Sequence, residues 1–193
     1  RRVYEFYTGL RNRVFSMPTG LDEEWIIGHP QYYNAGALQM FRLLKNSSGS
    51  NLVAGAAFVR DTVIYSGITQ GPLHGNALRA QFEFAPPMGR EFKGFYSVSA
   101  DVRTYRRLSS GMVAAARITL LNSSRKSGDF VLMGGSDMLR GRPYGSLAGN
   151  QIAYGSLEFR FPIADAVVFP RRFAIGPFRG ILFGDAGIAK FSG

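Results

Sequence analysis

The stretch from Gly134 to Ile163 joins two patterns that cannot belong to one regular element. Its first half is rich in glycine and contains Pro143, so it supplies positions for positive φ and a fixed kink. Its second half alternates, because Leu157, Phe159, Phe161 and Ile163 are separated by Glu158, Arg160 and Pro162. The stretch therefore predicts a long glycine-rich loop that leads into a β-strand with one apolar and one charged face.

Segments of comparable character recur along the chain and give about eight predicted strands, four of which alternate cleanly with a period of two. Besides Leu157–Ile163 the predicted strands are Val3–Leu10, Tyr32–Lys45, Leu52–Ser66, Asn76–Phe84, Lys93–Arg106, Met112–Leu121 and Phe178–Phe191. Turn-forming residues separate most of them. No linker divides the chain, and the sequence predicts an all-β, antiparallel fold in a single domain over residues 1–193.

The charged residues indicate what surrounds these strands. No stretch approaches 18 consecutive apolar residues, so no transmembrane helix is expected, but a barrel strand can span a bilayer with about 10 alternating residues. Arg79, Asp101 and Arg117 stand in mid-strand between large apolar neighbours. This favours lipid on one face and a wet lumen on the other. The alternation alone also fits a soluble β-sandwich or a ligand-binding barrel.

The formal net charge of +10 raises the question of nucleic-acid binding. The basic residues are dispersed, however, and the densest run is only Arg103, Arg106 and Arg107. Neither a helical basic stripe nor an aromatic-flanked RNA-binding signature is present. We therefore expect these charges to lie on turns and in a lumen, and we expect no nucleic-acid partner.

Residue types that carry catalysis or bind metals are scarce. Cysteine is absent, which excludes thiolate metal sites, thiol nucleophiles and disulfides. The two histidines, His29 and His74, stand in predicted loops. The sequence Gly134-Gly135-Ser136-Asp137-Met138 begins like a nucleophile elbow but lacks the closing glycine. We therefore expect a protein that is not an enzyme, with no catalytic residues, no cofactor and no metal site.

Five short sequences nevertheless resemble a known family when taken in order. They are Gly134-Gly135, Leu139-Arg140-Gly141, Gly149-Asn150, Glu158-Phe159-Arg160-Phe161-Pro162 and Phe183-Gly184-Asp185-Ala186-Gly187. Together they are similar to the sixth extracellular loop, with its (Val/Ile/Leu)-Arg-Gly-(Phe/Tyr) tip, and the next two strands of the BamA-like outer-membrane superfamily. The likeness covers about Asp129 to Lys190. Arg142 stands where the family has an aromatic residue, and Tyr144 is the nearby aromatic that could replace it.

This resemblance implies a transmembrane β-barrel of the bacterial outer membrane. In the family the loop joins strands eleven and twelve of sixteen, so we expect about eight strands of a larger barrel, from a processed chain or a portion lacking its periplasmic modules. Val3–Leu10 and Phe178–Phe191 should then be edges that do not pair with each other. We expect loops near residues 11, 68, 107 and 134 on the outer side, and turns near 46, 86, 122 and 164 on the inner side.

The resemblance also implies a function and a site. It suggests insertion or translocation of proteins at the outer membrane, with membrane lipid, unfolded or translocating polypeptides and accessory periplasmic or lipoprotein subunits as partners. Residues 134–150 would fold into the lumen, where Arg140 would pair with carboxylates at Glu158 and Asp185. The loop motif would comprise Leu139, Arg140, Gly141 and Tyr144, in an architectural role. A passive porin or ligand-receptor barrel and a soluble β-barrel binding protein remain the alternatives.

Overall fold

The computed structural model describes residues 2–13, 49–66, 71–88, 94–124, 131–165, 167–169 and 173–191. These residues form strands and their connections, without a helix. The strands are β1 (Arg2–Arg13), β2 (Gly49–Asp61), β3 (Ile64–Ser66), β4 (Gly71–Ala85), β5 (Phe95–Ser109), β6 (Met112–Ser123), β7 (Val131–Met133), β8 (Leu147–Gly149), β9 (Gln151–Ala164), β10 (Val167–Phe169), β11 (Phe173–Ile175) and β12 (Phe178–Lys190).

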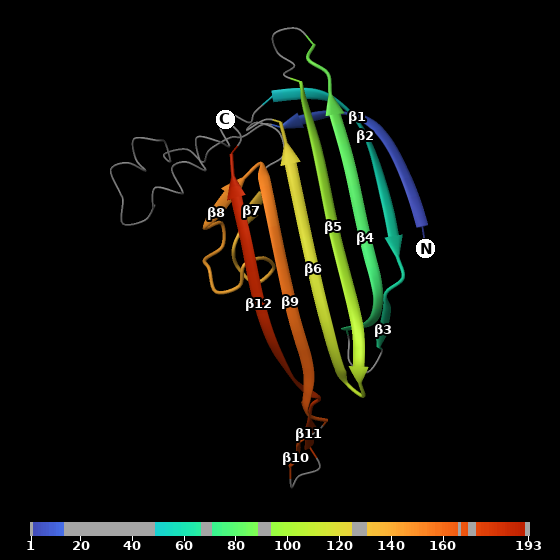
Figure 1. Cartoon of the computed structure of the whole chain (residues 1–193), viewed down its shortest axis with the longest axis vertical. Helices are drawn as coiled ribbons and strands as arrows, with labels where there is room; N and C mark the ends of the chain where they lie inside the picture. The colour runs from blue at the N-terminus through green and yellow to red at the C-terminus, as the bar shows by residue number, and fades with distance from the viewer. Residues whose placement is uncertain are drawn as a thin grey trace, which may run out of the picture.

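One antiparallel sheet contains all the long strands (Figure 1). Its order is β1-β2-β4-β5-β6-β9-β12, with β3 beside β4, while β7–β8 and β10–β11 form two small ribbons. The predicted all-β antiparallel fold is confirmed. Among the described strands β1 and β12 are the two edges and do not pair with each other, as expected, so these strands form an open sheet.

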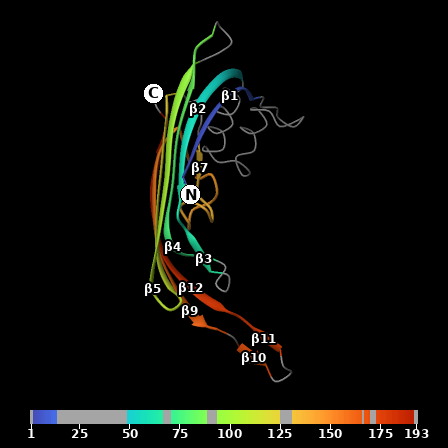
Figure 2. The same ribbon diagram turned by 90° about the vertical axis from the view of Figure 1, so that its right-hand side faces the viewer.

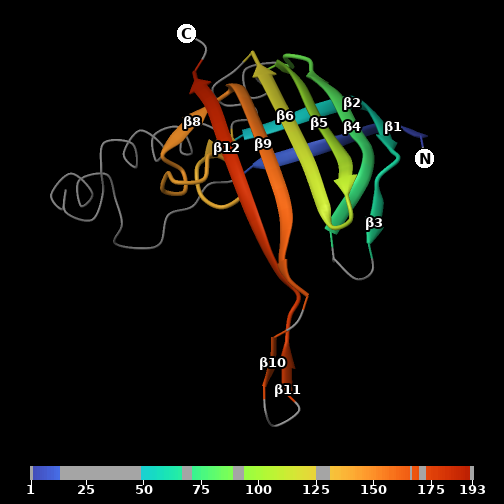
Figure 3. The ribbon, with the colours of Figure 1, turned by 60° about the horizontal axis from the view of Figure 1, so that its bottom comes forward.

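The sheet is curved, and its curvature creates the space in which the glycine-rich loop lies. Seen edge on in Figure 2, β1 and β2 bend toward the side that also carries the loop between β7 and β8. Figure 3 shows the curvature from another direction, with β1 and β2 passing behind β5, β6 and β9. We call this side the concave face and the opposite side the convex face.

The two faces differ sharply in chemistry, as the alternation predicts. On the convex face Ile118 is paired with Val102 of β5 and is 53% exposed. Other large apolar side chains exposed on this face are Tyr4, Phe6, Leu10, Leu52, Phe82, Phe84, Val98, Val102, Leu120, Leu157, Ile163, Leu182 and Ile188. The concave face instead carries polar networks, such as the Tyr7 hydroxyl, which donates to Glu83 Oε1 at 2.6 Å.

Two of the predicted strands need comment. The segment Leu52–Ser66 is predicted as one long strand that Arg60-Asp61 interrupts, and the structure divides it there, because β2 ends at Asp61 and β3 begins at Ile64. The Asp61 carboxylate accepts a hydrogen bond from the backbone amide of Val63 at 2.8 Å, which favours a local turn over the ladder. The predicted strand Tyr32–Lys45 lies outside the described residues.

The expected sidedness of the connections is wrong. The β5–β6 turn at Ser110-Gly111 and the start of β4 at Gly71 lie at the opposite end of the sheet from the 134–150 loop. By placing the turn near residue 122 and the loop near residue 134 on opposite sides, the prediction implied that the chain crosses the sheet between them. Among the residues described in that interval, the structure has β7, which is three residues long and pairs with β8 instead of crossing the sheet. In the described part of the chain, β6 is therefore the last strand that crosses the sheet before the loop.

Candidate functional site

The segment between β7 and β9 forms a small closed structure on the concave face. Its base is the β7–β8 ribbon, in which Val131 is paired with Gly149. The Gly135 amide donates to the Arg142 carbonyl at 2.9 Å, and the Arg142 amide donates to the Leu139 carbonyl at 3.2 Å. Gly141 has φ 90°, which the third position of a tight turn requires here and which glycine adopts without strain. These bonds place Arg140 at the tip.

Backbone hydrogen bonds hold the end of this segment to the neighbouring strands β6 and β12. Asn150 is fully buried, its carbonyl accepts the Ser123 amide of β6 at 2.8 Å, and its amide donates to the Lys190 carbonyl of β12 at 3.1 Å. A Cβ on Gly149 would lie 2.5 Å from the Lys190 carbonyl oxygen, so a side chain would push β8 away from β12. The Gly149-Asn150 pair noted in the sequence therefore has a structural reason.

A compact apolar cluster holds the body of the loop against the sheet. Met133, Ile152 and Tyr154 are buried in it, with 0%, 5% and 3% of their surface exposed. Leu139 packs against this cluster although its φ is 53°, a conformation that usually costs a non-glycine residue about 1–3 kcal/mol. Leu139 is the residue immediately before Arg140, and its side chain packs against the apolar cluster while its backbone adopts this conformation.

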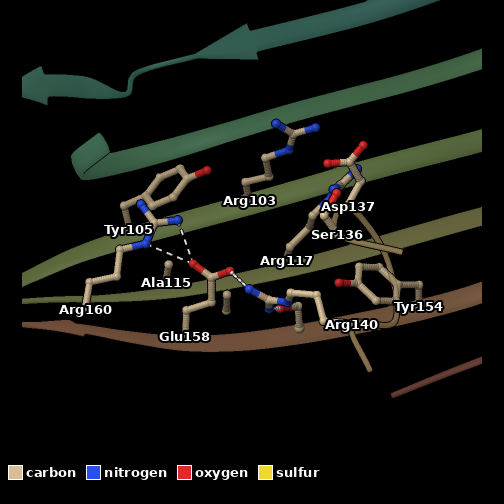
Figure 4. A pocket seen from close by; sticks show the side chains of 12 residues that line it. Arg103, Tyr105, Ala115, Arg117, Ser136, Asp137, Arg140, Tyr154, Glu158 and Arg160 are labelled. Carbon is tan, nitrogen blue, oxygen red and sulfur yellow. Dashed lines mark hydrogen bonds and ion pairs between the residues drawn. The ribbon is translucent and has the colours of Figure 1, made fainter. Parts of the chain in front are cut away.

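Arg140 is the centre of the site and is almost saturated with hydrogen bonds. Its Nε and Nη2 donate to Asp185 Oδ2 and Oδ1, both at 2.8 Å, which is a bidentate pairing. Nη1 donates to Glu158 Oε1 at 2.6 Å, and Nη2 also donates to the Ser156 hydroxyl at 2.9 Å. The backbone amide of Arg140 adds a bond to Asp185 Oδ2 at 2.9 Å. Figure 4 shows the Arg140–Glu158 contact.

Strand register explains why these groups meet. Ser156 of β9 lies directly opposite Asp185 of β12, and Glu158 lies opposite Phe183. All four side chains therefore point to the concave face in two adjacent rows. The side chain of Asp185 is only 3% exposed, and those of Glu158 and Arg140 are 17% and 19% exposed. Hydrogen bonding to Asp185 raises the pKa of Arg140 above its usual range, so its guanidinium remains charged.

Most of the predicted site residues come together. Leu139, Arg140 and Gly141 form the tip, and Arg140 makes the expected ion pairs with Glu158 and Asp185. Tyr144 does not join them. It is 78% exposed and lies near Gly135, so it does not take the place of the family's aromatic residue at the tip.

Three participants were missed by the reasoning from sequence. The Phe183 ring lies under the Arg140 guanidinium, with its centroid 3.9 Å from Cζ. Ser156 accepts a hydrogen bond from Arg140, and Arg160 binds the second oxygen of Glu158 through Nη2 at 2.6 Å. Period-2 counting from Glu158 and Asp185 could have placed all three on the face of these carboxylates, because each is two residues from one of them, but it does not show which of them contact Arg140.

A second charged cluster lies beside the first. Asp101 Oδ1 accepts from Arg103 Nε at 2.6 Å, and Oδ2 accepts from Arg117 Nε at 2.8 Å and from the Thr119 hydroxyl at 2.9 Å. Between the two clusters is a cavity of about 200 Å³ (Figure 4). The concave face therefore carries both a saturated ion-pair cluster and an open polar cavity.

Comparisons with known proteins do not place the chain in a family. No protein-family model matches it, and no curated protein matches it. Within the described residues, no helix is long and apolar enough to cross a membrane. No group of three or more histidine, aspartate or glutamate side chains in the described ranges could hold a metal ion.

Gly187 offers a direct test of how the loop is seated. A Cβ there would lie 2.6 Å from Met133 Cε and 2.7 Å from Leu139 Cδ1. Gly187→Val should therefore displace the loop, at a cost of about 1–3 kcal/mol for an overpacked contact. We expect faster hydrogen exchange of the amides in residues 134–150, measured by mass spectrometry.

Gly184→Val is the matched control, since Gly184 is on the same strand and a Cβ there meets no atom within 4 Å. This variant should leave exchange in the loop unchanged. Equal exchange in both variants would show that contact with Gly187 does not hold the loop.

Proposed function

We propose that the chain forms β-barrel strands of a bacterial outer-membrane protein of the BamA-like superfamily, which acts in the insertion or translocation of polypeptides. The observation that carries this proposal is the contact of the loop tip with two strands. Arg140 reaches Glu158 on β9 and Asp185 on β12, the positions at which the family resemblance expects partners. Membrane lipid and unfolded polypeptides would be the partners.

The convex face supports a location in lipid. Isolated exposed apolar residues are normal on soluble proteins, but large contiguous apolar surfaces mark contact with a partner or a membrane. Here the exposed apolar side chains belong to every long strand of the sheet, including Phe6 of β1, Ile118 of β6 and Leu182 of β12. A soluble β-barrel would instead turn such a face inward.

The role proposed for Arg140 is architectural. All three guanidinium nitrogens are engaged, so none is left to activate or bind a reacting group. The ion pairs instead fix a loop across the concave face. In a barrel this would narrow the lumen and connect β9 and β12 through one side chain, which suits a component that must hold a defined shape while clients pass or insert.

A passive pore or receptor barrel is the second candidate. The cavity beside Arg140 is polar and open, and it is lined by Arg103, Arg117 and Arg160 among others. Such a surface suits passage or binding of small charged solutes. This candidate needs the same membrane location but no contact with client polypeptides.

Reconstitution separates the two candidates. The purified chain would be inserted into vesicles of outer-membrane lipids, and an unfolded β-barrel client would then be added. We expect the client to fold faster than in empty vesicles, as measured by its resistance to protease. Ion conductance without any acceleration of client folding would contradict the proposal and favour the passive pore.

A further inference from the structure

The cavity beside Arg140 is lined by small side chains and by arginines from three neighbouring strands. Its floor is formed by Ala115 of β6 and Ser156 of β9, two small buried side chains between larger neighbours. Arg103 and Arg117 line it from β5 and β6, and Arg160 lines it from β9. Figure 4 shows these arginines on neighbouring strands around the same space. The cavity thus exists because the small side chains of Ala115 and Ser156 leave space between larger neighbours on the concave face.

Like charges face each other at this position. Arg103 and Arg117 are directly opposite in the β5–β6 ladder. Two like charges in such a pair destabilise a sheet unless another group offsets them. Asp101 is that group, but a single carboxylate serves both guanidinium groups, and among the described residues no other carboxylate forms an ion pair with either of them.

A carboxylate is likewise shared on the other side of the cavity. Glu158 is shared between Arg140 and Arg160. In the ion pairs of the two clusters, four arginines therefore share three carboxylates, namely Asp101, Glu158 and Asp185. Asp137 of the loop also lines the cavity, but it is exposed and forms no ion pair within the described part of the chain.

We propose that this cavity binds a small oxyanion, a carboxylate or a phosphate group, through Arg103 and Arg117. Arg103 gives only its Nε to Asp101, so its two Nη groups are not engaged with that carboxylate. A guanidinium fork matches the planar oxygens of a carboxylate and the edge of a phosphate. An anion between the two arginines would supply the negative charge that Asp101 alone provides now. This inference does not depend on the proposed membrane function.

The test is a titration of the full chain in an uncharged detergent with inorganic phosphate and, separately, with acetate. The Nε–Hε signals of Arg103 and Arg117 would be followed by nuclear magnetic resonance. We expect a saturable shift. Arg117→Gln, which leaves Asp101 paired with Arg103, should weaken binding about tenfold, because a charge-assisted hydrogen bond is lost.

Two further variants locate the site. Asp137→Asn removes a carboxylate that lines the cavity without an ion pair, so it should tighten binding by about threefold or more. Arg106→Ala is the matched control, because Arg106 is on the same strand as Arg103 but on the convex side, and binding should not change. Shifts that never saturate, an affinity that is unchanged in Arg117→Gln, or an affinity that is unchanged in Asp137→Asn would overturn the proposal.

Discussion

Arg140→Ala should leave the sheet folded but release the 134–150 loop from the concave face. The substitution removes the bonds to Asp185, Glu158 and Ser156 and leaves Asp185, with 3% of its side chain exposed, without its main partner. Loss of one partner of a well-buried ion pair costs about 3–5 kcal/mol. The measurement is the free energy of local opening, from hydrogen exchange of the loop amides.

Three related variants make this test specific. Arg140→Lys should rescue only in part, because an ammonium group cannot bind Asp185 through two parallel hydrogen bonds. Asp185→Ala should release the loop much as Arg140→Ala does, and the double variant should cost clearly less than the sum of the two. Simple additivity would show that the two residues are not coupled. Release of the loop can also be followed by limited proteolysis. Chymotrypsin is then the suitable protease, because Arg140 is itself a trypsin site that the substitution removes.

The functional consequence can be measured in the same variants. If the docked loop is part of the proposed mechanism, vesicles carrying Arg140→Ala should accelerate client folding less than those carrying the wild-type chain. Arg142→Ala is a suitable control because Arg142 is exposed in the same turn and its side chain makes no hydrogen bond to described residues. Normal client folding with a freely exchanging loop would exclude the loop from the mechanism.

Ile118→Arg should severely reduce folding into lipid. Ile118 is in the middle of β6 on the convex face, paired with Val102 and Gly155 of the neighbouring strands. An arginine at the bilayer midplane on the lipid face of a barrel costs about 2–4 kcal/mol. The measurement is the urea dependence of folding in lipid vesicles, where this cost should appear as a lower midpoint.

Ser99→Arg is the matched control, since it introduces the same side chain on the adjacent strand but on the concave face. A wet concave face should tolerate it with a cost below about 1 kcal/mol. If Ile118→Arg folds as well as the wild type, or if Ser99→Arg is the more damaging change, the convex face does not contact lipid and the membrane proposal fails.

The sequence by itself determined the strands and their faces. Period-2 alternation is a local property, since successive side chains of any strand point to opposite sides. It therefore placed Glu158 and Arg160 on one face and Leu157 on the other before any pairing was known. Glycine and proline likewise marked the loop, because the conformations that they allow or forbid are properties of single residues.

The tertiary structure decided which faces meet and which strands are neighbours. The short ribbon of β7 and β8 does not cross the sheet, so the sidedness inferred by counting strands was wrong. Tyr144 is close to the tip in sequence but is exposed and lies near Gly135, whereas Phe183 lies under Arg140 although it is 43 positions further along the chain. Contacts of this kind depend on register between distant strands, which no local pattern records.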